Sequence, residues 1–200
     1  MKKAEQSEAT RTALLEVARE LFTERGYAGT ATEDIAQRAG VTRGALYYQF
    51  GDKSGLFYAV LEGISLNTNE KVATAMHSGQ GARGDRWDQI VHAGTAAYLD
   101  ACMDPAVQRI GLIEAPAVLG WEEKRELDRK YGISLISGAI QALMDIGLIA
   151  PQPIEPLAHL VLSAVLEAAM YIARADDIPA ARKEMGASLE RLLDGMRVRG

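Results

Sequence analysis

The sequence predicts an all-α protein of about nine helices, and three observations support this fold class. Apolar residues recur with the period of an α-helix over nearly the whole chain. No segment shows sustained alternation of apolar and polar residues, so strands are not expected. All six prolines lie at or after Pro105, which leaves the first hundred residues without a residue that interrupts helices.

The first helix is predicted from Leu14, Ala18, Leu21 and Phe22, which fall on one helical face, and Gly26 is its expected C-terminal stop. The left-handed conformation that ends many helices costs glycine little, because glycine has no Cβ atom.

Two short helices and a longer one are expected next. Thr32, which precedes two acids, is the predicted N-cap of the second helix, and Gly40 ends it. Thr42 caps a third helix. A fourth helix starts at Asp52 or Ser54 and continues through Leu61 and Ile64.

Glycine and proline divide the rest of the chain. The glycine-rich residues 79–84 form the clearest internal loop, and Asp104 with Pro105 is an N-cap and first-turn pair. Pro116 should kink or stop the helix that follows. The remaining helices are expected at residues 85–103, 105 to about 116, 122–146, 156–174 and 179–198.

Charge and cysteine content exclude several classes of protein. The net charge is 22 − 27 = −5, whereas a protein that coats nucleic acid non-specifically is usually basic. Residues 1–53 hold eight basic and eight acidic side chains, so this part repels a polyanion least. The single Cys102 excludes an internal disulfide. With no signal peptide and no uninterrupted apolar span, we expect a cytoplasmic protein without a membrane partner.

Residues 36–46 have the spacing of a helix-turn-helix. Ala36 is small where two helices cross, Gly40 permits the turn, and Leu46 anchors the second helix. The N-terminal residues of such a second helix meet base edges in the major groove, and an arginine pairs with two acceptors of guanine. The candidate DNA contacts from this geometry are Thr42, Arg43, Gly44, Ala45, Tyr47, Tyr48 and the phosphate clamp Lys53.

Residues 8–57 resemble the N-terminal motif of TetR-family (tetracycline-repressor-like) regulators. The resemblance rests on Gly26-Tyr27, Thr30, Asp34-Ile35-Ala36, the run from Ala39 to Phe50, Lys53 and Leu56-Phe57. Gln49 stands where the family often has histidine, but its amide can still donate to a phosphate. The resemblance adds Thr30, Thr32 and Gln49 to the candidate DNA contacts, although the two threonines could serve only as helix caps.

The resemblance also implies two domains with different functions. Residues 1–53 would form the DNA-binding domain, and residues 54–200 a helical ligand-binding and dimerisation domain. A homodimer would bind double-stranded DNA at an inverted-repeat operator and be released by a small-molecule effector. That makes the protein a repressor, without cofactor or metal. An activator, or a ligand-independent regulator on the same scaffold, stays open.

Residues 157–173 are apolar on nearly every side, so they need cover on two faces. A second apolar stripe lies on the last helix. Both agree with the dimer bundle that the resemblance implies, and the alternative is burial within one subunit. The predicted dimer residues are Leu157, Val161, Ala164, Val165, Ala168, Leu189, Leu192, Leu193 and Met196.

Aromatic and methionine side chains are candidates for an effector pocket, placed around Pro116 and Trp121. They equally suit a packed core. Few basic residues lie in the apolar stripes, which favours a small, largely apolar ligand over a highly anionic one. The candidates are Tyr98, Met103, Ile113, Pro116, Trp121, Tyr131, Ile140, Met144 and Tyr171.

A helical enzyme or ligand-binding domain with a vestigial helix-turn-helix is the alternative from another class. Asp88 and His92 are four residues apart, as metal ligands on one helix face would be, but no third ligand is identifiable. Cys102 is expected to be a small core residue rather than a nucleophile. No nucleophile elbow or phosphate-binding glycine loop occurs, so we expect no enzyme.

Overall fold

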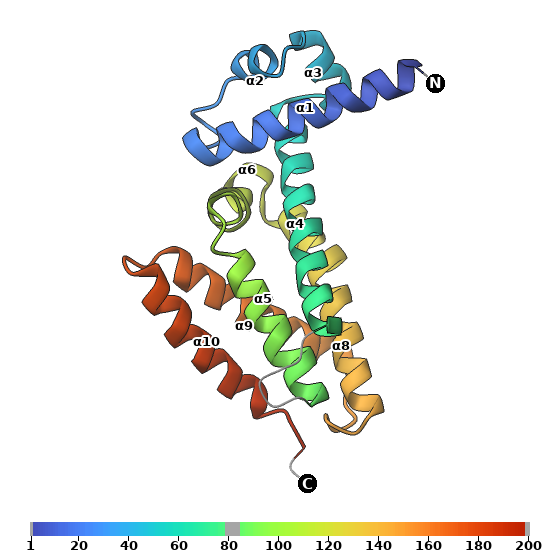
Figure 1. The fold of residues 1–200 in the computed structure, drawn as a ribbon, viewed down its shortest axis with the longest axis vertical. Helices are drawn as coiled ribbons and strands as arrows, with labels where there is room; N and C mark the ends of the chain where they lie inside the picture. The colour runs from blue at the N-terminus through green and yellow to red at the C-terminus, as the bar shows by residue number, and fades with distance from the viewer. Residues whose placement is uncertain (1, 79–84, 199–200) are drawn as a thin grey trace. The chain divides into compact units, whose positions relative to one another are not determined.

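The chain folds into helices, as a computed structural model shows for residues 2–78 and 85–198 (Figure 1). When each π-helical segment is counted with the α-helix that continues it, these residues form nine continuous helices. Within the same residues no strand occurs, and an isolated bridge pairs Ile149 with Arg197. The all-α prediction is therefore confirmed. The predicted loop at residues 79–84 lies outside the described residues.

Two compact units make up the fold. The N-terminal unit contains residues 1–65 and 105–124, and the C-terminal unit contains residues 66–104 and 125–200. One boundary falls inside the continuous helix α4 (Lys53–Ser78). This division differs from the predicted one at residues 53 and 54, because residues 105–124 pack with the start of the chain.

The N-terminal unit is built on α1 (Lys2–Arg25), α2 (Thr32–Arg38), α3 (Arg43–Phe50) and the first half of α4. Its core includes Phe22 and Phe57, whose rings meet edge to face with centroids 5.3 Å apart. The ring of Tyr27 contacts both of them. This aromatic cluster fixes the end of α1 against α4.

The predicted starts and stops of these helices hold with one exception. Gly26 and Gly40 have φ angles of 75° and 67°, the left-handed conformation that glycine permits. The Thr42 hydroxyl accepts a hydrogen bond from the backbone N–H of Ala45 and caps α3. Thr32, by contrast, does not cap α2, because Ala31 is the N-cap and the Thr32 side chain is buried.

Of the two predicted starts for α4, the hydrogen bonds select Asp52. Its carboxylate accepts from the backbone N–H of Gly55 at 2.7 Å, which is the pattern of an N-cap. The helix continues to Ser78, well beyond the apolar residues from which it was predicted.

Residues 105–124 complete the N-terminal unit with η2 (Val107–Glu114), α6 (Ala115–Leu119) and the first turn of α7 (Trp121–Asp128). Ile110 and Ala115 are fully buried. Pro116 lies in the first turn of α6, where the hydrogen-bond pattern has just changed from π to α, and Gly120 ends the helix at φ 85°. The helical segment continues through Pro116 as far as Leu119, so this proline does not stop it.

The C-terminal unit joins the second half of α4 to the helices of residues 85–104 and 125–200. These are η1 (Asp88–His92), α5 (Ala93–Ala101), the end of α7, η3 (Arg129–Ile133), α8 (Ser134–Asp145), α9 (Ile154–Ala173) and α10 (Ile178–Asp194). The predicted long helix at 122–146 is continuous from 121 to 145, with η3 as a π-helical segment inside it.

Helix α9 packs against α5, α8 and α10 (Figure 1). It is long and apolar enough to cross a membrane by length and composition, the one such helix in the part of the chain that the structure describes. A helix in the core of a globular protein passes the same test, and five α9 side chains are buried inside this unit.

Candidate DNA-binding surface and effector cavity

The α2–α3 pair has the geometry of a helix-turn-helix. The backbone N–H of Val41 donates to the Ala36 carbonyl at 3.0 Å across the turn, where Gly40 adopts its left-handed conformation. Ala36 and Leu46 are buried where the two helices meet. All three residues of the predicted spacing therefore lie where the motif requires them.

The start of α3 is open to solvent. Thr42, Arg43 and Gly44 are exposed, and a Cβ atom at Gly44 would meet only the Thr42 hydroxyl, at 3.8 Å. Ala45 is half-buried on the next position. The Tyr48 side chain is 85% exposed one turn later. This surface can approach a DNA groove without rearrangement of the backbone.

Arg43 is held by two neighbours on this surface. Its Nη1 atom lies 2.5 Å from Oε1 of Glu33, and its Nη2 atom donates to the Tyr47 hydroxyl at 3.1 Å. The Tyr47 hydroxyl lies 3.3 Å from Oγ1 of Thr32, which donates to Oε2 of Glu33 at 3.1 Å. Four side chains thus close a ring of contacts between α2 and α3.

The contacts in this ring favour the ionised form of both Arg43 and Glu33. The Tyr47 hydroxyl and, next, the Glu33 charge raise the pKa of the Arg43 guanidinium. Hydrogen bonds from the backbone and from Thr32 lower the pKa of the Glu33 carboxyl. Both side chains are therefore ionised over the whole physiological pH range.

Four other predicted DNA contacts have partners within the chain. Thr30 is buried, and its hydroxyl lies 2.7 Å from the Gly26 carbonyl, to which it donates. Thr32 is buried in the ring described above. The Gln49 amide donates to the hydroxyl of Ser7 at 2.8 Å, and the Lys53 ammonium lies 4.2 Å above the ring of Tyr27. Burial lowers the pKa of Lys53.

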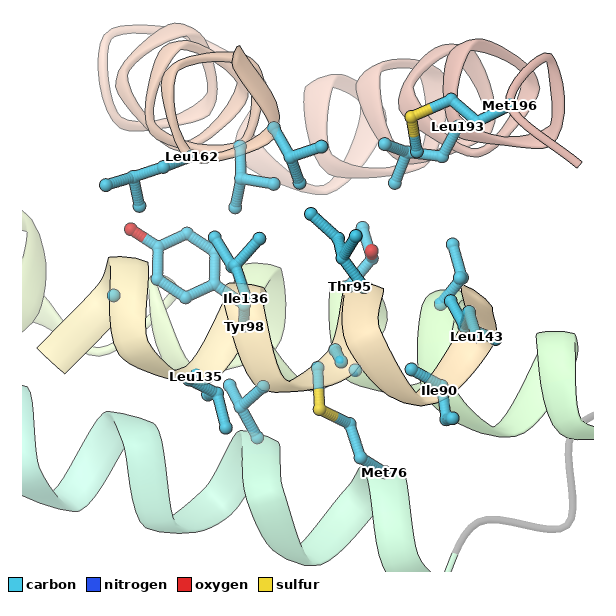
Figure 2. A pocket seen from close by; sticks show the side chains of 18 of the residues that line it. Met76, Ile90, Thr95, Tyr98, Leu135, Ile136, Leu143, Leu162, Leu193 and Met196 are labelled. Atoms are coloured by element: carbon cyan, nitrogen blue, oxygen red, sulfur yellow. The ribbon is translucent and has the colours of Figure 1, made fainter. Parts of the chain in front are cut away.

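A cavity of about 100 Å³ lies in the C-terminal unit (Figure 2). Figure 2 shows Met76 of α4 on one side and Leu162 and Leu193 of α9 and α10 on the opposite side, with Thr95 and Tyr98 between them. Helix α8 supplies a run of aliphatic side chains along the wall. Five helices thus converge on this cavity.

Among the described residues, uncharged side chains line the cavity. Twenty of these residues line it, and none of the twenty is Asp, Glu, Lys, Arg or His. The polar side chains are Asn69, Thr95 and Tyr98. Burial raises the pKa of Tyr98 well above its usual value, so this phenol stays neutral and can donate or accept a hydrogen bond.

Known protein families and structures match both parts of the chain. Residues 14–60 match the family described as "Bacterial regulatory proteins, tetR family", and residues 87–196 match "Tetracyclin repressor-like, C-terminal domain". The second match alone covers more than half of the chain. The chain belongs to the TetR family. It is a DNA-binding transcriptional regulator with a helix-turn-helix, as the resemblance predicted.

A solved structure is similar to this TetR-family chain over nearly its whole length. It is a TetR-family transcriptional regulator from Pectobacterium atrosepticum, 36% identical, with a TM-score of 0.82 and 97% of each chain covered.

Curated relatives match more locally. The transcriptional regulator TtgR of Pseudomonas putida is 40% identical over 74 residues, which is 37% of this chain and 35% of TtgR. The transcriptional repressor BepR of Brucella suis is 46% identical over 59 residues, which is 30% of this chain and 28% of BepR. The chain thus matches only about a third of the length of these curated relatives, or less.

The cavity of this TetR-family chain includes only some of the predicted pocket residues. Tyr98 and Ile140 line it. Trp121, Ile113 and Tyr171 are exposed instead, and Pro116 lies in the other unit. Met103, Tyr131 and Met144 do not line this cavity either. Residues that the sequence analysis passed over, such as Asn69, Thr95 and the aliphatic face of α8, form most of the wall.

The predicted dimer residues divide between the inside and the outside of the subunit. Val165, Ala168, Leu189 and Leu193 are buried within this one chain, and Leu157, Val161, Ala164 and Met196 are half-buried. Leu192 is exposed. Four of the predicted dimer residues line the cavity instead: Val161, Val165, Leu193 and Met196. The exposed apolar side chains of α9 are Leu160 and Tyr171, which the prediction did not include as dimer residues.

Asp88, His92 and Asp194 form a cluster of closely spaced polar side chains. The Nδ1 atom of His92 lies 3.0 Å from Asp88, and the Nε2 atom lies 2.7 Å from Asp194, which also accepts from the Trp87 indole at 2.7 Å. The two ring nitrogens therefore face different carboxylates. Among the described residues no group of three or more His, Cys, Asp or Glu side chains is arranged to hold a metal ion.

Proposed function

We propose that this chain is a repressor that binds an inverted-repeat operator as a homodimer and is released by a small, neutral, largely apolar effector. The exposed N-terminus of α3, with Arg43 and Gly44 at its tip, is the observation that supports DNA readout. An arginine at this position can pair with the O6 and N7 acceptors of guanine. We further propose that the protein is cytoplasmic, where chromosomal DNA is accessible to it.

The proposed dimerisation is supported by the outer faces of α9 and α10. Leu160 and Leu192 are 69% and 61% exposed, and Tyr171 is 52% exposed. Large apolar side chains gathered on two adjacent helices favour association. A two-fold dimer presents two copies of α3, and its symmetry requires half-sites about one helical turn apart, roughly 34–36 Å, or a multiple of that distance.

The effector proposal rests on the cavity lining. An engineered apolar cavity of roughly 150 Å³ binds benzene, so a cavity of about 100 Å³ suits a ligand of a few heavy atoms or one that displaces its walls slightly. A charged ligand would lose its hydration without finding a counter-charge among the described residues that line the cavity. The ligand is therefore neutral, with at most a few hydrogen-bonding groups that meet Asn69, Thr95 or Tyr98.

Helix α4 connects the cavity with the DNA-binding helices. Asn69, Val72 and Met76 line the cavity from its second half, and Lys53 begins its first half, beside α3. A ligand shifts a conformational equilibrium only by its difference in affinity for the two states. We propose that effector binding changes the set of α4 orientations and so the spacing of the two α3 helices in the dimer.

Recovery and sequencing of genomic fragments bound by the purified protein tests the DNA proposal. An inverted repeat is expected, and the absence of any sequence selection would overturn the DNA proposal.

Titration with benzyl alcohol and with benzoate, which share a ring and differ in charge, tests the effector proposal. Benzyl alcohol should bind and benzoate should not. By linkage, operator DNA must lower the affinity of the protein for benzyl alcohol by the same factor by which benzyl alcohol lowers its affinity for the operator.

A further inference from the structure

Acidic side chains balance the basic ones in the part of the chain that contains the helix-turn-helix. Residues 1–53 contain eight basic and eight acidic side chains. Arg25 is paired with Asp34 at 3.1 Å, and Arg38 is paired with Glu20 at 2.7 Å. Because non-specific DNA affinity comes from cationic contacts to phosphates, a balanced charge favours arbitrary DNA less than a basic surface would. Base contacts then carry more of the selectivity.

Arg43, the proposed base-reading residue, is also paired with a carboxylate. Glu33 lies in the first turn of α2, ten positions before Arg43, and the turn between α2 and α3 brings their side chains to 2.5 Å. Both side chains are about half-exposed, at 55% and 54%. An ion pair this exposed contributes little to folding stability, because water screens the attraction between the two charges. The pair with Arg43 therefore adds little to the stability that Glu33 already gives α2 as an acid in its first turn.

Geometry gives a different reason. Glu33 and Tyr47 contact the two terminal nitrogens of the guanidinium, which fixes the plane of the fork. The Arg43 group also lies 5.4 Å from the centre of the Tyr47 ring. Thr32, buried beneath, ties the Glu33 carboxylate and the Tyr47 hydroxyl to the body of α2. An arginine held this way has lost most of its rotamer freedom before it meets a base, so less entropy is lost on binding.

We propose that Glu33 is a specificity-determining residue of the DNA-binding surface, which positions the Arg43 guanidinium for one base and adds a repulsion that weakens the binding of DNA of any sequence. The carboxylate stands beside the expected phosphate backbone as a fixed negative charge. Its repulsion acts on every sequence, whereas the positioning helps only a sequence with guanine at the Arg43 position. The inference rests on the DNA-binding function proposed above.

The experiment compares three DNA duplexes. These are the selected operator, the same operator with the Arg43-contacted base pair replaced in both half-sites, and unrelated DNA of equal length. The Arg43→Ala variant identifies that base pair as the position where discrimination relaxes. Binding is measured at several salt concentrations, because affinities for DNA compare only at matched salt.

Glu33→Ala should lower discrimination at that base pair about tenfold, which is the lower half of what an arginine–guanine pair supplies. Its affinity for unrelated DNA should rise severalfold. Glu33→Gln, which keeps an acceptor oxygen but loses the charge, should retain part of the discrimination. In an Arg43→Ala background, Glu33→Ala should have no further effect at that base pair.

Asp34→Asn is the matched control. It removes one negative charge from the adjacent position of α2, where the carboxylate pairs with Arg25 and not with Arg43. It should raise the affinity for unrelated DNA to a similar extent and leave base discrimination unchanged. Thermal unfolding of both variants checks that the fold is retained.

Three results would overturn the proposal. If Glu33→Ala tightens all three duplexes equally, Glu33 is only a repulsive charge. If Asp34→Asn relaxes discrimination as much as Glu33→Ala, positioning of Arg43 is not the cause. If the wild type prefers no sequence at all, the proposed DNA-binding function fails together with this inference, which separates that outcome from the first two.

Discussion

The carboxylate of Glu114 accepts a hydrogen bond from the backbone N–H of Tyr27, 87 positions earlier in the chain, at 2.8 Å. Arg109 lies between the same two segments, 3.4 Å from Glu114 and 3.3 Å from the carbonyl of Glu24, to which it donates. A Cβ atom at Gly26 would overlap the Glu114 carboxylate. Residues 105–124 are thus bonded to the turn that ends α1, although the family match places them in the C-terminal domain.

Replacement of Glu114 by alanine should destabilise the protein by about 1–3 kcal/mol, because it leaves a partly buried backbone N–H without its acceptor. Glu114→Gln keeps an acceptor oxygen and should cost less. Urea unfolding measures both variants. Glu122→Ala, at an exposed position of the neighbouring helix, is the control and should change stability by less than about 0.5 kcal/mol. Equal effects at Glu114 and Glu122 would show that the contact is not made in solution.

Local chemistry explains which features could be predicted from the sequence. Gly26, Gly40 and Thr42 act on the residues next to them, so their helix ends follow from the chain itself. The burial of Thr32, by contrast, depends on Tyr47, which is distant in sequence and reaches it only once the motif has folded. The pairing of Glu33 with Arg43 was missed for the same reason.

The cavity and the outer faces of α9 could not be separated from sequence, because both are apolar. Val165 lines the cavity and Leu160 faces solvent, yet hydropathy treats them alike. Trp121 and Ile113 suggested a pocket by residue type but are exposed. Only tertiary packing assigns a helix face to a ligand, to the core or to a partner. The predicted residues therefore included members of all three classes.

Cys102 should make stability fall at alkaline pH. Burial raises the pKa of its thiol from 9.0 to about 11. As pH rises past about 9 the unfolded chain releases this proton while the native chain keeps it, so the unfolded state is favoured. Between pH 8 and pH 10 the loss should be about 1.3 kcal/mol, at roughly 1.36 kcal/mol for each pKa unit of difference.

Urea unfolding of the wild type and of Cys102→Ala at pH 8 and pH 10 measures the contribution of this thiol to the loss of stability. The variant is expected to be less stable at both values because it leaves a small void, but its loss between the two pH values should be smaller by that amount. Tyr98, whose pKa is also raised, contributes in the same direction to both proteins. Parallel pH dependences would show that the thiol is not buried as described.

Filling the cavity should abolish effector binding without weakening DNA binding. Ala139 lines the cavity from α8, and Ala139→Leu adds three carbon atoms to the space that a ligand would occupy. Calorimetric titration with benzyl alcohol should show at least a tenfold loss of affinity, while operator binding stays within twofold of the wild type. Ser134→Leu, which adds a leucine at an exposed position of the same helix, is the control. Undiminished binding of the alcohol to Ala139→Leu would place the ligand elsewhere.

Charge on the outer faces of α9 and α10 should dissociate the proposed dimer. Leu160→Glu and Leu192→Glu each place a carboxylate on an exposed apolar face, and in a two-fold dimer each appears twice. If these faces meet, each variant buries unpaired charge and should raise the dissociation constant at least a hundredfold. Sedimentation velocity at micromolar concentration distinguishes monomer from dimer.

A control substitution on another helix makes the dimer experiment decisive. Leu66→Glu introduces the same charge at a leucine of α4 that is 50% exposed, so it controls for the substitution itself and should leave the dimer intact. Val165 and Leu193 are unsuitable, because both are buried in the subunit and a charge there would report on folding. The monomeric variants should also lose affinity for the inverted repeat while they retain weak binding to a single half-site, since one α3 helix then acts alone. A wild type that sediments as a monomer, or Leu160→Glu and Leu192→Glu variants that remain dimeric, would rule out this interface and leave the pairing of half-sites to another surface.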